Sequence, residues 1–560
     1  MSLSLSPAAC ENLSELVICL SLGNLCFLRR WYDLEHLQSR SVDYFRNGPP
    51  DQTLLYAVLI CSALLTMVFW LLWQWVKRSG SPRLIKFARC GFLLTLIYPL
   101  ESVRRYWNIE IGHVDWGSSA ALLAIELLLA IGLGMTLAGN LRILRTARKV
   151  ALAMVFLLPA LLADFFWSPG GAEPVSAYQP KPSLPLLHTR PASGRGPAPR
   201  IIWLLFDELD QRLAFNQRQP SVAMPELDRL RAESFAATHA FQTGGYTMIA
   251  IPSLLSGRIY TNADMADADS LRVRPEGSER EVDWRGEPNV FRRARELGVN
   301  AAVVGWHHPY CRVLGDNLVR CFDEPSDPSP ALMRESDAAE DGLLKTMGVQ
   351  LSRLAVNLFD IFRPDADSIS EKLKDASLQR RQQQQYFKIR DHAYRDAIDK
   401  QIDFLYVHFP APHLFAIYDR QRQNFALSGK TTYFDNLALV DRTVGELRRK
   451  LEEAGLWDST SILITSDHGL RRELWHGHLN WTPEFDRLLA GGSSPLVPLI
   501  LKLAGSHEGV VYDQPFSSVV EGDLALAVIK NEVTTPRQIP EWLAKHTAPP
   551  SDLSARKVAP

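Results

Sequence analysis

Potential metal ligands end or follow several short apolar runs in the second half of the chain. They are Asp207 and Glu208 after IIWLLF (201–206), His408 within FLYVHF (404–409), His413 in the turn beyond it, Asp467 and His468 after SILITS (461–466), and His476 and His478 in WHGHLNW. Fixed oxygen and nitrogen donors on a rigid frame suit Zn²⁺ or Mn²⁺, with Mg²⁺ or Ca²⁺ as alternatives. The pattern predicts one or two divalent metal ions.

Each of these features also has an ordinary structural interpretation. An acidic residue after a strand is often a helix cap, an Asp-His-Gly sequence is often a turn with a solvated histidine, and both histidines of HGH could lie on the surface. Several such features at successive strand ends are much harder to reach by accident. Their combination favours a single site.

The elements that must position these ligands are strands alternating with helices. The runs 201–206, 301–306, 404–409, 461–466 and 498–503 are almost continuously apolar, as expected of strands covered on both faces. Helical patterns such as 225–236 and 436–455 lie between them, and a charged, Gln-rich helical stretch covers 335–400. This alternation predicts an α/β fold with a mostly parallel sheet, in which ligands gather at the carboxyl ends of the strands.

The segment GWHHPYCR (305–312) adds two histidines after another predicted strand. His307 and His308 could line the rim of the pocket or form a structural turn, and the sequence does not separate these roles. Cys311 and Cys321 are ten residues apart and form a plausible disulfide in an oxidising compartment, with two free buried thiols as the alternative.

Long apolar runs before residue 170 predict a multi-span α-helical membrane domain over residues 1–167. The five predicted spans are 13–28, 53–76, 87–103, 118–141 and 150–167, of which 13–28 and 87–103 are the weaker. Basic clusters at 77–89 and 142–149 place two loops in the cytoplasm by the positive-inside rule. The last span then runs outward, whether there are four spans or five.

The rest of the chain is then extracytoplasmic, and we expect a bacterial inner-membrane protein with a periplasmic catalytic domain. Residues 168–200 are rich in Pro, Gly and Ser and predict an extended linker. The catalytic domain is expected over 201–530 and a C-terminal tail over 531–560. The net charge of −1 gives no reason to expect a nucleic-acid partner.

Two segments resemble a known group of enzymes. The segment YFDNLALVDRTVGELRRKLEEAGLWDSTSILITSDHG (433–469) is similar to the one that carries the Asp-His-Gly signature in sulfatases and related alkaline phosphatase superfamily enzymes. HFPAPH (408–413) resembles both the Pro-His turn of sulfatases and the paired histidines of phosphoethanolamine transferases. The resemblance covers roughly residues 200–520. It implies an alkaline-phosphatase-like sheet, one or two divalent metals, and a covalent intermediate on a nucleophile at the start of a helix.

The family patterns place that nucleophile in GGYTMIAIPSLLSGR (244–258). Sulfatases carry a Cys or Ser ten residues before the Gly of an L-L-T-G-R ending, and ten residues before Gly257 stands Thr247. Phosphoethanolamine transferases use a Thr five residues before a Pro, and Thr247 is five residues before Pro252. The formylglycine of sulfatases cannot be made from Thr. The alternative role for Thr247 is that of a helix cap.

The chemistry of a threonine nucleophile requires a metal or a base, because its hydroxyl is a poor nucleophile at neutral pH. The resemblance implies that Asp207, Asp467 and His468 share a metal ion with Thr247, while Glu208 is a less secure ligand. The remaining histidines would fill a second metal site, bind the phosphate or protonate the leaving group; they are His408, His413, His476 and His478.

The leading hypothesis is therefore a membrane-anchored phospho-group transferase with a phospho-Thr247 intermediate. Its spans and outward domain resemble phosphoethanolamine and phosphoglycerol transferases, which implies a membrane phospholipid donor and a lipid-linked or envelope glycan acceptor. Because the sequences around LLSGR and PAPH resemble those of sulfatases, the second hypothesis is a hydrolase of phosphate or sulfate esters. A third hypothesis is a non-catalytic membrane scaffold or sensor that keeps a decayed domain.

Overall fold

The computed structural model of the chain describes residues 6–37, 44–45, 52–106, 131–167, 184–187, 199–326, 342–360, 369–426, 431–476, 481–489 and 492–547. The chain divides into two compact units. The first comprises Met1–Val42, Gly48–Ser176 and Ser329–Lys374, and the second Asp43–Asn47, Ala177–Pro328 and Asp375–Pro560.

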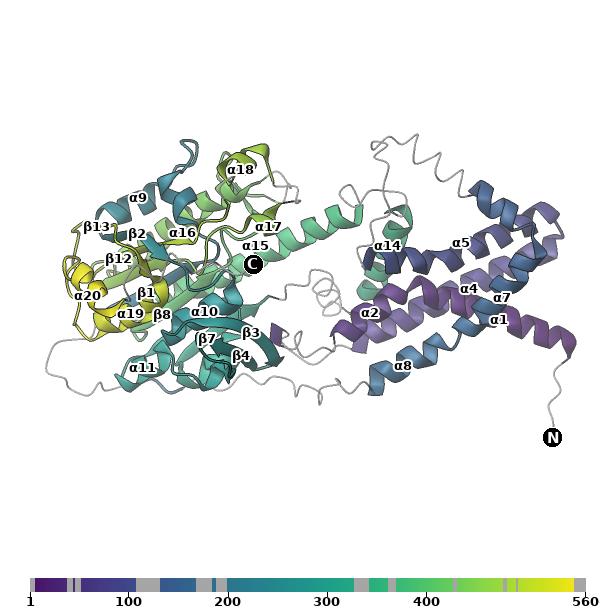
Figure 1. The fold of residues 1–560 in the computed structure, drawn as a ribbon, viewed down its shortest axis with the longest axis horizontal. Helices are drawn as coiled ribbons and strands as arrows, with labels where there is room; N and C mark the ends of the chain where they lie inside the picture. The colour runs from purple at the N-terminus through teal and green to yellow at the C-terminus, as the bar shows by residue number, and fades with distance from the viewer. Residues whose placement is uncertain are drawn as a thin grey trace. The chain divides into compact units, whose positions relative to one another are not determined.

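The second unit is built on a nine-stranded mixed sheet, visible in Figure 1. Its strand order is β13-β2-β12-β11-β1-β8-β6-β7, and β14 also pairs with β2. The strands are β1 (Arg200–Phe206), β2 (Phe235–Phe241), β6 (Ala301–His307), β7 (Arg320–Pro325), β8 (Phe404–Phe409), β11 (Thr460–Thr465), β12 (Leu496–Lys502), β13 (Val510–Tyr512) and β14 (Phe516–Ser517). The five strands β11, β1, β8, β6 and β7 are parallel neighbours, whereas β12 runs antiparallel to β11 and β2.

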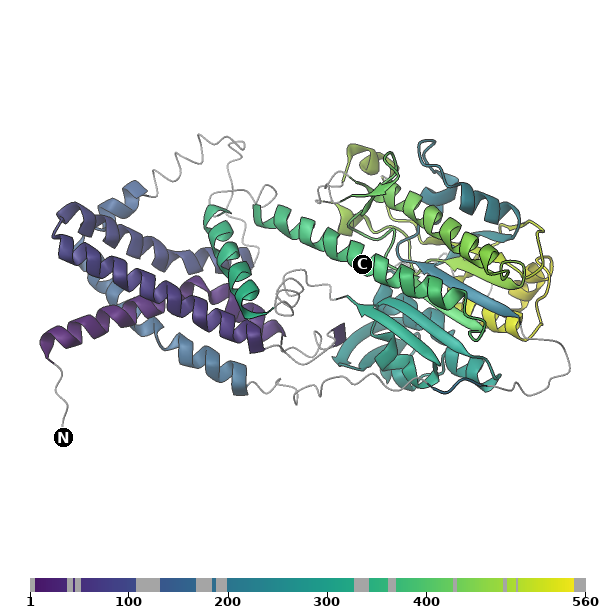
Figure 2. The ribbon, with the colours of Figure 1, turned by 180° about the vertical axis from the view of Figure 1, so that it is seen from behind.

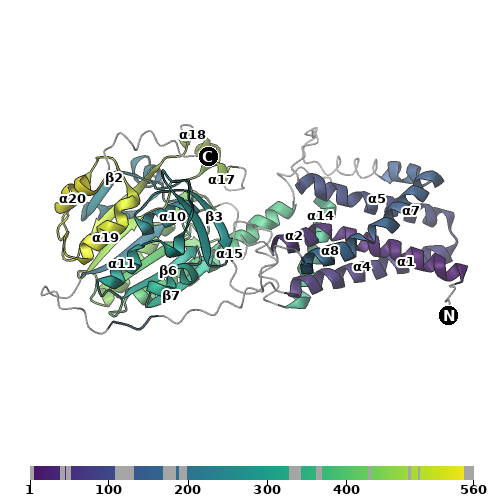
Figure 3. The ribbon, with the colours of Figure 1, turned by 60° about the horizontal axis from the view of Figure 1, so that its bottom comes forward.

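Helices cover both faces of this sheet, which is why its central strands, such as β1, β8 and β11, are almost continuously apolar and buried. In β1 the side chains alternate: Ile202 and Leu204 belong to one buried cluster, and Ile201 and Trp203 to the other. The first cluster is completed by α9 (Pro225–Ala232), α15 (Ile369–Ala397) and α16 (Tyr433–Glu453), of which α15 and α16 lie in front of the strands in Figure 2. The second is completed by α10 (Thr247–Ser256), α11 (Val290–Glu296), α19 (Glu521–Ile529) and α20 (Gln538–His546), which share one face in Figure 3.

Smaller elements complete the second unit. They are a three-stranded sheet of β3 (Tyr260–Asp267), β4 (Ser270–Pro275) and β5 (Val282–Asp283), the pair β9 (Tyr418–Asp419) and β10 (Asn424–Phe425), and the short helices α12 (Tyr310–Leu314), α17 (Arg472–Trp475) and α18 (Pro483–Leu488).

The α/β fold and the mostly parallel sheet predicted from the sequence are confirmed. All five apolar runs form strands of this sheet, each within two residues of the predicted position. One expectation is wrong at the C-terminus: residues 531–547 are not a tail. They contain α20, whose Ile539 and Leu543 are fully buried against the second face of the sheet because its apolar side chains complete that core.

The first unit is helical. Its helices are α1 (Pro7–Cys26), α2 (Leu28–Leu37), α4 (Gln52–Ser79), α5 (Pro82–Tyr106), α7 (Leu141–Met154), α8 (Leu157–Trp167) and α14 (Leu343–Asp360). The sequence placed α14 inside the catalytic domain, but it belongs here. Its Met347 and Leu354 pack into the apolar cluster around α4, and Cys61 of α4 contacts the Met347 carbonyl at 3.8 Å.

Two of the described helical segments are long and apolar enough to cross a bilayer, Gln52–Ser79 and Leu141–Ala163. The predicted spans 13–28, 53–76 and 87–103 correspond to α1, α4 and α5. The predicted span 118–141 lies mostly outside the described residues. The predicted span 150–167 is divided, because α7 ends at Met154 and α8 begins at Leu157. The number of spans therefore stays a prediction.

Gly305 in β6 provides a test of how the sheet makes room for the side chains near its carboxyl edge. A Cβ at this position would lie 2.1 Å from Cδ2 of Tyr310, whose hydroxyl is 2.9 Å from Nδ1 of His408. Because both groups are buried, Gly305→Ala must displace the Tyr310 ring. We expect it to lower the free energy of unfolding by about 1–3 kcal/mol, measured by thermal or denaturant unfolding.

The matched control is Gly315→Ala. A Cβ there meets nothing within 4 Å and the backbone φ is −56°, so its stability should stay within about 0.5 kcal/mol of the wild type. Equal losses in the two variants would contradict the proposed role of the Gly305–Tyr310 contact.

Candidate active site

Four side chains meet at the carboxyl ends of β1 and β11 and the start of α10. Asp207 follows β1, and Asp467 and His468 follow β11; one potential ligand atom from each lies within 4.8 Å of the others, and all three residues are fully buried. The Thr247 hydroxyl lies 3.2 Å from Oδ2 of Asp207 and 3.3 Å from Nε2 of His468. The structure thus brings together the four residues that the sequence assigned to one metal and one nucleophile.

Thr247 does not cap its helix. The N-cap of α10 is Tyr246, which has extended backbone, and Thr247 is the first helical residue. The Thr247 hydroxyl faces the two carboxyl-edge residues instead, at the end of a helix whose N-terminal amides favour negative charge. The helix ends at Gly257, whose left-handed φ of 68° closes it.

The hydrogen bonds of His468 fix which ring nitrogen is free. Its Nδ1 lies 2.9 Å from the Gly469 carbonyl oxygen, which can only accept, so Nδ1 carries the proton. In the neutral ring Nε2 then presents a lone pair, and it lies 3.3 Å from Oδ2 of Asp467. A lone pair directed at a carboxylate oxygen is unfavourable unless a cation or a proton lies between them.

Within the part of the chain that the structure describes, two carboxylate oxygens at the same place have no hydrogen-bond partner. They are Oδ1 of Asp207 and Oδ2 of Asp467, both in fully buried side chains. Buried polar atoms in native proteins are rarely left unpaired, and a bound ion is one of the explanations. Together with the free Nε2 of His468 they form an O,O,N donor set that fits a divalent metal such as Zn²⁺ or Mn²⁺.

The two carboxylates titrate differently. Burial, with Asp467 nearby, raises the pKa of Asp207 to about 7. Burial also disfavours the charge on Asp467, but His468, His408 and hydrogen bonds to its oxygens outweigh it and lower its pKa below the ordinary value. With this pKa, Asp207 of the metal-free protein can take up a proton near neutral pH.

The four histidines predicted for a second metal or for the phosphate do not all lie at the site. His408 joins the site, because its Nε2 is 3.2 Å from Oδ2 of Asp207, and burial lowers its pKa to about 4. His413 is linked to Glu208 through Arg471, whose Nη2 is 3.2 Å from His413 Nε2 and whose Nε donates to Glu208. His476 is exposed and packs on Trp481, with ring centroids 5.4 Å apart. His478 lies outside the described residues.

Glu208 is held away from the free carboxylate oxygens. Its Oε1 accepts from Arg471 Nε at 3.1 Å and its Oε2 from Trp475 Nε1 at 2.8 Å. Burial alone would raise its pKa, but His413 and Arg471 lower it overall. Its backbone has φ = 64°, an uncommon value for a residue with a side chain, and its N–H donates to Asp467 Oδ1 at 3.2 Å.

His307 and His308 end the β6 edge of the site. His308 is fully buried beneath α10: its Nε2 donates to the Thr247 carbonyl at 3.2 Å, and its Nδ1 is 2.9 Å from the Tyr44 hydroxyl. His307 has φ = 73° and its ring is 5.3 Å from that of His308. Burial lowers the pKa of both, that of His308 to about 3. Cys311 and Cys321 are joined in a disulfide with 5.5 Å between their Cα atoms.

Four residues of this site were not anticipated from the sequence: Tyr44, Tyr310, Arg471 and Trp475. Tyr44 lies far from the catalytic segment in sequence, and nothing in its surroundings marks it as part of the second unit. Arg471 and Trp475 flank the Asp-His-Gly segment closely enough that a search for counter-charges to Glu208 would have found Arg471.

Comparison with known proteins finds one matching family and several similar solved structures. A family profile described as type I phosphodiesterase / nucleotide pyrophosphatase matches residues 202–486. No curated relative matches the sequence. Among solved structures, a sulfatase from Pseudoalteromonas sp. is 16% identical over 61% of this chain and 70% of that chain, with a TM-score of 0.39.

Two further solved structures are similar at the same level. A phosphonate monoester hydrolase from Silicibacter pomeroyi is 16% identical over 63% of this chain and 78% of that chain, with a TM-score of 0.37. The lipoteichoic acid synthase LtaP from Listeria monocytogenes is 13% identical over 59% of this chain and 72% of that chain, with a TM-score of 0.33.

The raised pKa of Asp207 predicts a pH dependence of both stability and metal binding. A carboxyl whose pKa rises from 3.8 to about 7 on folding stabilises the metal-free protein at low pH and loses that contribution as the pH rises to 7. A divalent metal needs the carboxylate form. The metal-induced rise in melting temperature should therefore be larger at pH 8 than at pH 5.

Thermal unfolding with and without Zn²⁺, after chelation, checks this. Asp207→Asn should flatten the pH dependence of the metal-free protein and abolish most of the metal response. Asp391→Asn, a change at an exposed carboxylate of α15, should alter neither. A wild-type metal response of equal size at both pH values would contradict the assignment.

Proposed function

We propose that this chain, which belongs to the type I phosphodiesterase / nucleotide pyrophosphatase family, is a membrane-anchored, extracytoplasmic transferase of phosphoethanolamine or phosphoglycerol groups that forms a phospho-Thr247 intermediate. The family membership confirms the resemblance to the alkaline phosphatase superfamily and the expectation of a metal-dependent phosphotransferase or hydrolase. The transfer reaction, the threonine intermediate and the membrane anchor are the parts that we propose.

One observation carries the proposal: the Thr247 hydroxyl, at the start of α10, contacts both a carboxylate and the imidazole of the buried cluster. It lies 3.2 Å from Asp207 and 3.3 Å from His468, and it is not engaged as a helix cap. A covalent mechanism needs a hydroxyl within hydrogen-bond reach of a group that takes its proton. Asp207, whose Oδ2 accepts a hydrogen bond from this hydroxyl, is that group in this proposal.

In the first half-reaction, the Thr247 oxygen attacks the phosphorus of the donor diester. A new bond forms between Oγ1 and phosphorus, the bond from phosphorus to the lipid oxygen breaks, and the Thr247 proton passes through Asp207 to the departing oxygen, which leaves as the lipid alcohol. A divalent ion held by Asp207, Asp467 and His468 would lower the pKa of the hydroxyl and stabilise charge on the phosphoryl oxygens. The N-terminal amides of α10 favour the same charge.

His408 orients Asp207 in this scheme. An ionised Asp207 can only accept, so His408 Nε2 donates to it, and the Tyr310 hydroxyl then donates to Nδ1 at 2.9 Å. The low pKa of His408 keeps the ring neutral at pH 7, which suits a positioning role rather than that of a general acid. In the second half-reaction an acceptor hydroxyl attacks phosphorus, the bond from phosphorus to Oγ1 breaks, and the acceptor's proton passes through Asp207 to Thr247.

Membrane anchoring explains why such an enzyme would use a phospholipid donor. The helical segments Gln52–Ser79 and Leu141–Ala163 support an anchor in the bilayer, and the basic clusters beside them support a bacterial inner-membrane protein with a periplasmic catalytic domain. The Cys311–Cys321 disulfide agrees with an oxidising compartment. Tethering keeps enzyme and lipid at one surface, and an envelope glycan is the proposed acceptor.

Hydrolysis is the second candidate, because the family description names phosphodiesterases. The same phospho-Thr247 could be resolved by water instead of a glycan hydroxyl. The scaffold hypothesis is disfavoured by the intact contacts of Asp207, Thr247 and His468.

Substitution of Thr247 tests the covalent step. Thr247→Ala removes the nucleophile and should abolish acid-stable labelling of the protein by a phospholipid that carries a radiolabelled head group. Thr247→Ser keeps a hydroxyl and should retain labelling at a reduced rate. Turnover of the lipid by Thr247→Ala at the wild-type rate would sink the mechanism, and labelling that appears only when no acceptor glycan is added would support transfer over hydrolysis.

Membrane placement is tested by extraction. We expect the full-length protein to stay in the membrane fraction at alkaline pH and to be released by detergent, because an apolar helix of 28 residues such as Gln52–Ser79 inserts stably. Protease added to spheroplasts should cleave the second unit. Release without detergent would disprove the anchor, and protection of the second unit would disprove its orientation.

A further inference from the structure

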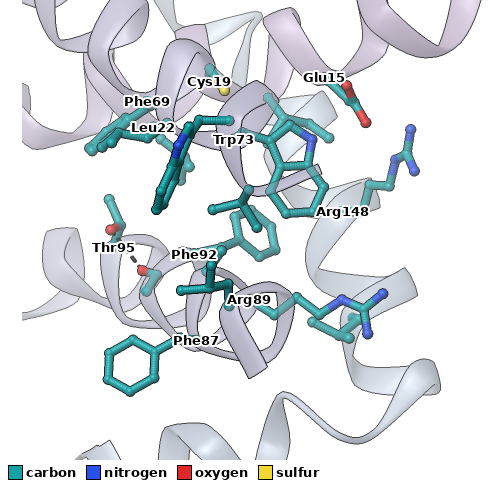
Figure 4. A pocket seen from close by; sticks show the side chains of 18 of the residues that line it. Glu15, Cys19, Leu22, Phe69, Trp73, Phe87, Arg89, Phe92, Thr95 and Arg148 are labelled. Carbon is teal, nitrogen blue, oxygen red and sulfur yellow. Dashed lines mark hydrogen bonds between the residues drawn. The ribbon is translucent and has the colours of Figure 1, made fainter. Parts of the chain in front are cut away.

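The first unit contains a cavity of about 860 Å³ between α1, α4, α5 and α7. Its volume falls within the range of ordinary ligand-binding pockets. The proposed catalytic chemistry uses none of the residues that line it. Figure 4 shows its side chains, with charged groups gathered at one end and aromatic and aliphatic groups at the other.

The walls of this pocket are apolar. Leu22 of α1, Phe69 and Trp73 of α4, and Phe92 of α5 face the space in Figure 4, and Phe87 of α5 lies at its edge. Such a surface gains little from holding water and binds hydrocarbon well. A small inorganic anion would leave these walls uncovered, so the pocket suits a ligand with an acyl chain.

The charged end of the pocket carries unbalanced positive charge. Its one lining carboxylate, Glu15, is already engaged: Oε2 accepts from Lys77 Nζ at 2.5 Å and from Gln74 Nε2 at 3.3 Å. Three lining arginines remain, and they are Arg89, Arg145 and Arg148. Nη2 of Arg148 donates a hydrogen bond to Ser14 Oγ at 2.6 Å, which holds the guanidinium beside α1.

A cluster of arginines at the mouth of an apolar pocket matches a phosphate with attached acyl chains. Guanidinium groups bind phosphate oxygens in pairs, and basic pockets between membrane helices recognise anionic lipid head groups. A zwitterionic choline lipid would bring a second cation to the same place. The charge therefore selects anionic phospholipid over neutral phospholipid.

We propose that this pocket binds an anionic phospholipid, with its phosphate on Arg89, Arg145 and Arg148 and an acyl chain along Leu22, Phe69 and Phe92. The inference rests on the membrane placement proposed above. By the positive-inside rule the arginine end lies on the cytoplasmic side, because α4 ends and α5 begins there at Lys77, Arg78 and Arg83. The bound lipid is therefore a cytoplasmic-leaflet ligand and not the donor consumed on the outer side.

The test is native mass spectrometry of the full-length protein in detergent, titrated with dioleoyl-phosphatidylglycerol or dioleoyl-phosphatidylcholine. We expect the wild type to bind phosphatidylglycerol about tenfold more tightly, a difference of about 1.4 kcal/mol. The double variant Arg89→Gln, Arg148→Gln should lose that preference while its affinity for phosphatidylcholine stays within twofold. Binding of phosphatidylglycerol by this variant at wild-type affinity would overturn the proposal.

A matched control removes the same charge from the same region without touching the pocket. Arg83 and Lys86 are exposed residues of α5 that do not line the cavity, so Arg83→Gln, Lys86→Gln should keep the preference. An equal loss in this control would show that only general surface charge attracts the lipid, which also overturns the pocket assignment.

A steric variant tests the apolar half independently of charge. Gly91 lines the pocket and a Cβ there meets nothing within 4 Å, so Gly91→Trp adds a large ring at the pocket wall with little strain on its neighbours. It should weaken both lipids by about tenfold or more; unchanged binding would contradict a lipid inside the pocket. Labelling of Thr247, measured on the same wild-type preparations, separates this proposal from the catalytic one. A wild type that labels Thr247 but shows no preference for phosphatidylglycerol refutes only the lipid pocket, and one that shows the preference but no labelling refutes only the catalytic proposal.

Discussion

The second unit is organised around the cost of burying two carboxylates, Asp207 and Asp467, at one edge of its sheet. Each charge removed from water costs several kcal/mol unless it is paired or hydrogen-bonded. Backbone N–H groups of Glu208 and His468 donate to one oxygen of Asp467, and His408 and Thr247 contact one oxygen of Asp207. One oxygen of each carboxylate stays unpaired. A divalent cation held by Asp207, Asp467 and His468 would offset this cost and supply the electrostatic part of the proposed chemistry.

The sheet order explains why these groups meet. Strands β11, β1, β8 and β6 are parallel neighbours, so the residues at their carboxyl ends lie along one edge. The helix α10 presents its first residue to that edge, supported from below by the contact of His308 with the Thr247 carbonyl. Gly305 leaves space for Tyr310, which in turn orients His408. Each contact holds the next, so the geometry of Thr247 depends on residues remote from it in sequence.

Much of this arrangement follows from local sequence features. Continuous apolar runs specify buried parallel strands, and polar residues at their ends specify the edge on which Asp207, His408, Asp467 and His468 meet. The two family spacings that converge on Thr247 identified the residue that the structure places beside them.

What the sequence could not reveal depends on long-range packing. Arg471 claims Glu208, which removes the nearest alternative carboxylate, and His476 turns outward onto Trp481 instead of joining the site. The inclusion of α14 in the helical unit, of Tyr44 beneath His308 and of α20 in the sheet core has the same origin, because no local pattern records which surface an apolar helix face will meet.

The proposed mechanism depends on Thr247 being the covalent centre next to a metal. Diffraction from crystals of the full-length protein, grown with Zn²⁺ and a slowly transferred phosphodiester and measured at the zinc absorption edge, tests it most directly. We predict an anomalous peak in contact with Asp207, Asp467 and His468, and phosphoryl density continuous with Oγ1 of Thr247. A peak at other ligands, or phosphoryl density joined to any other side chain, would contradict the account.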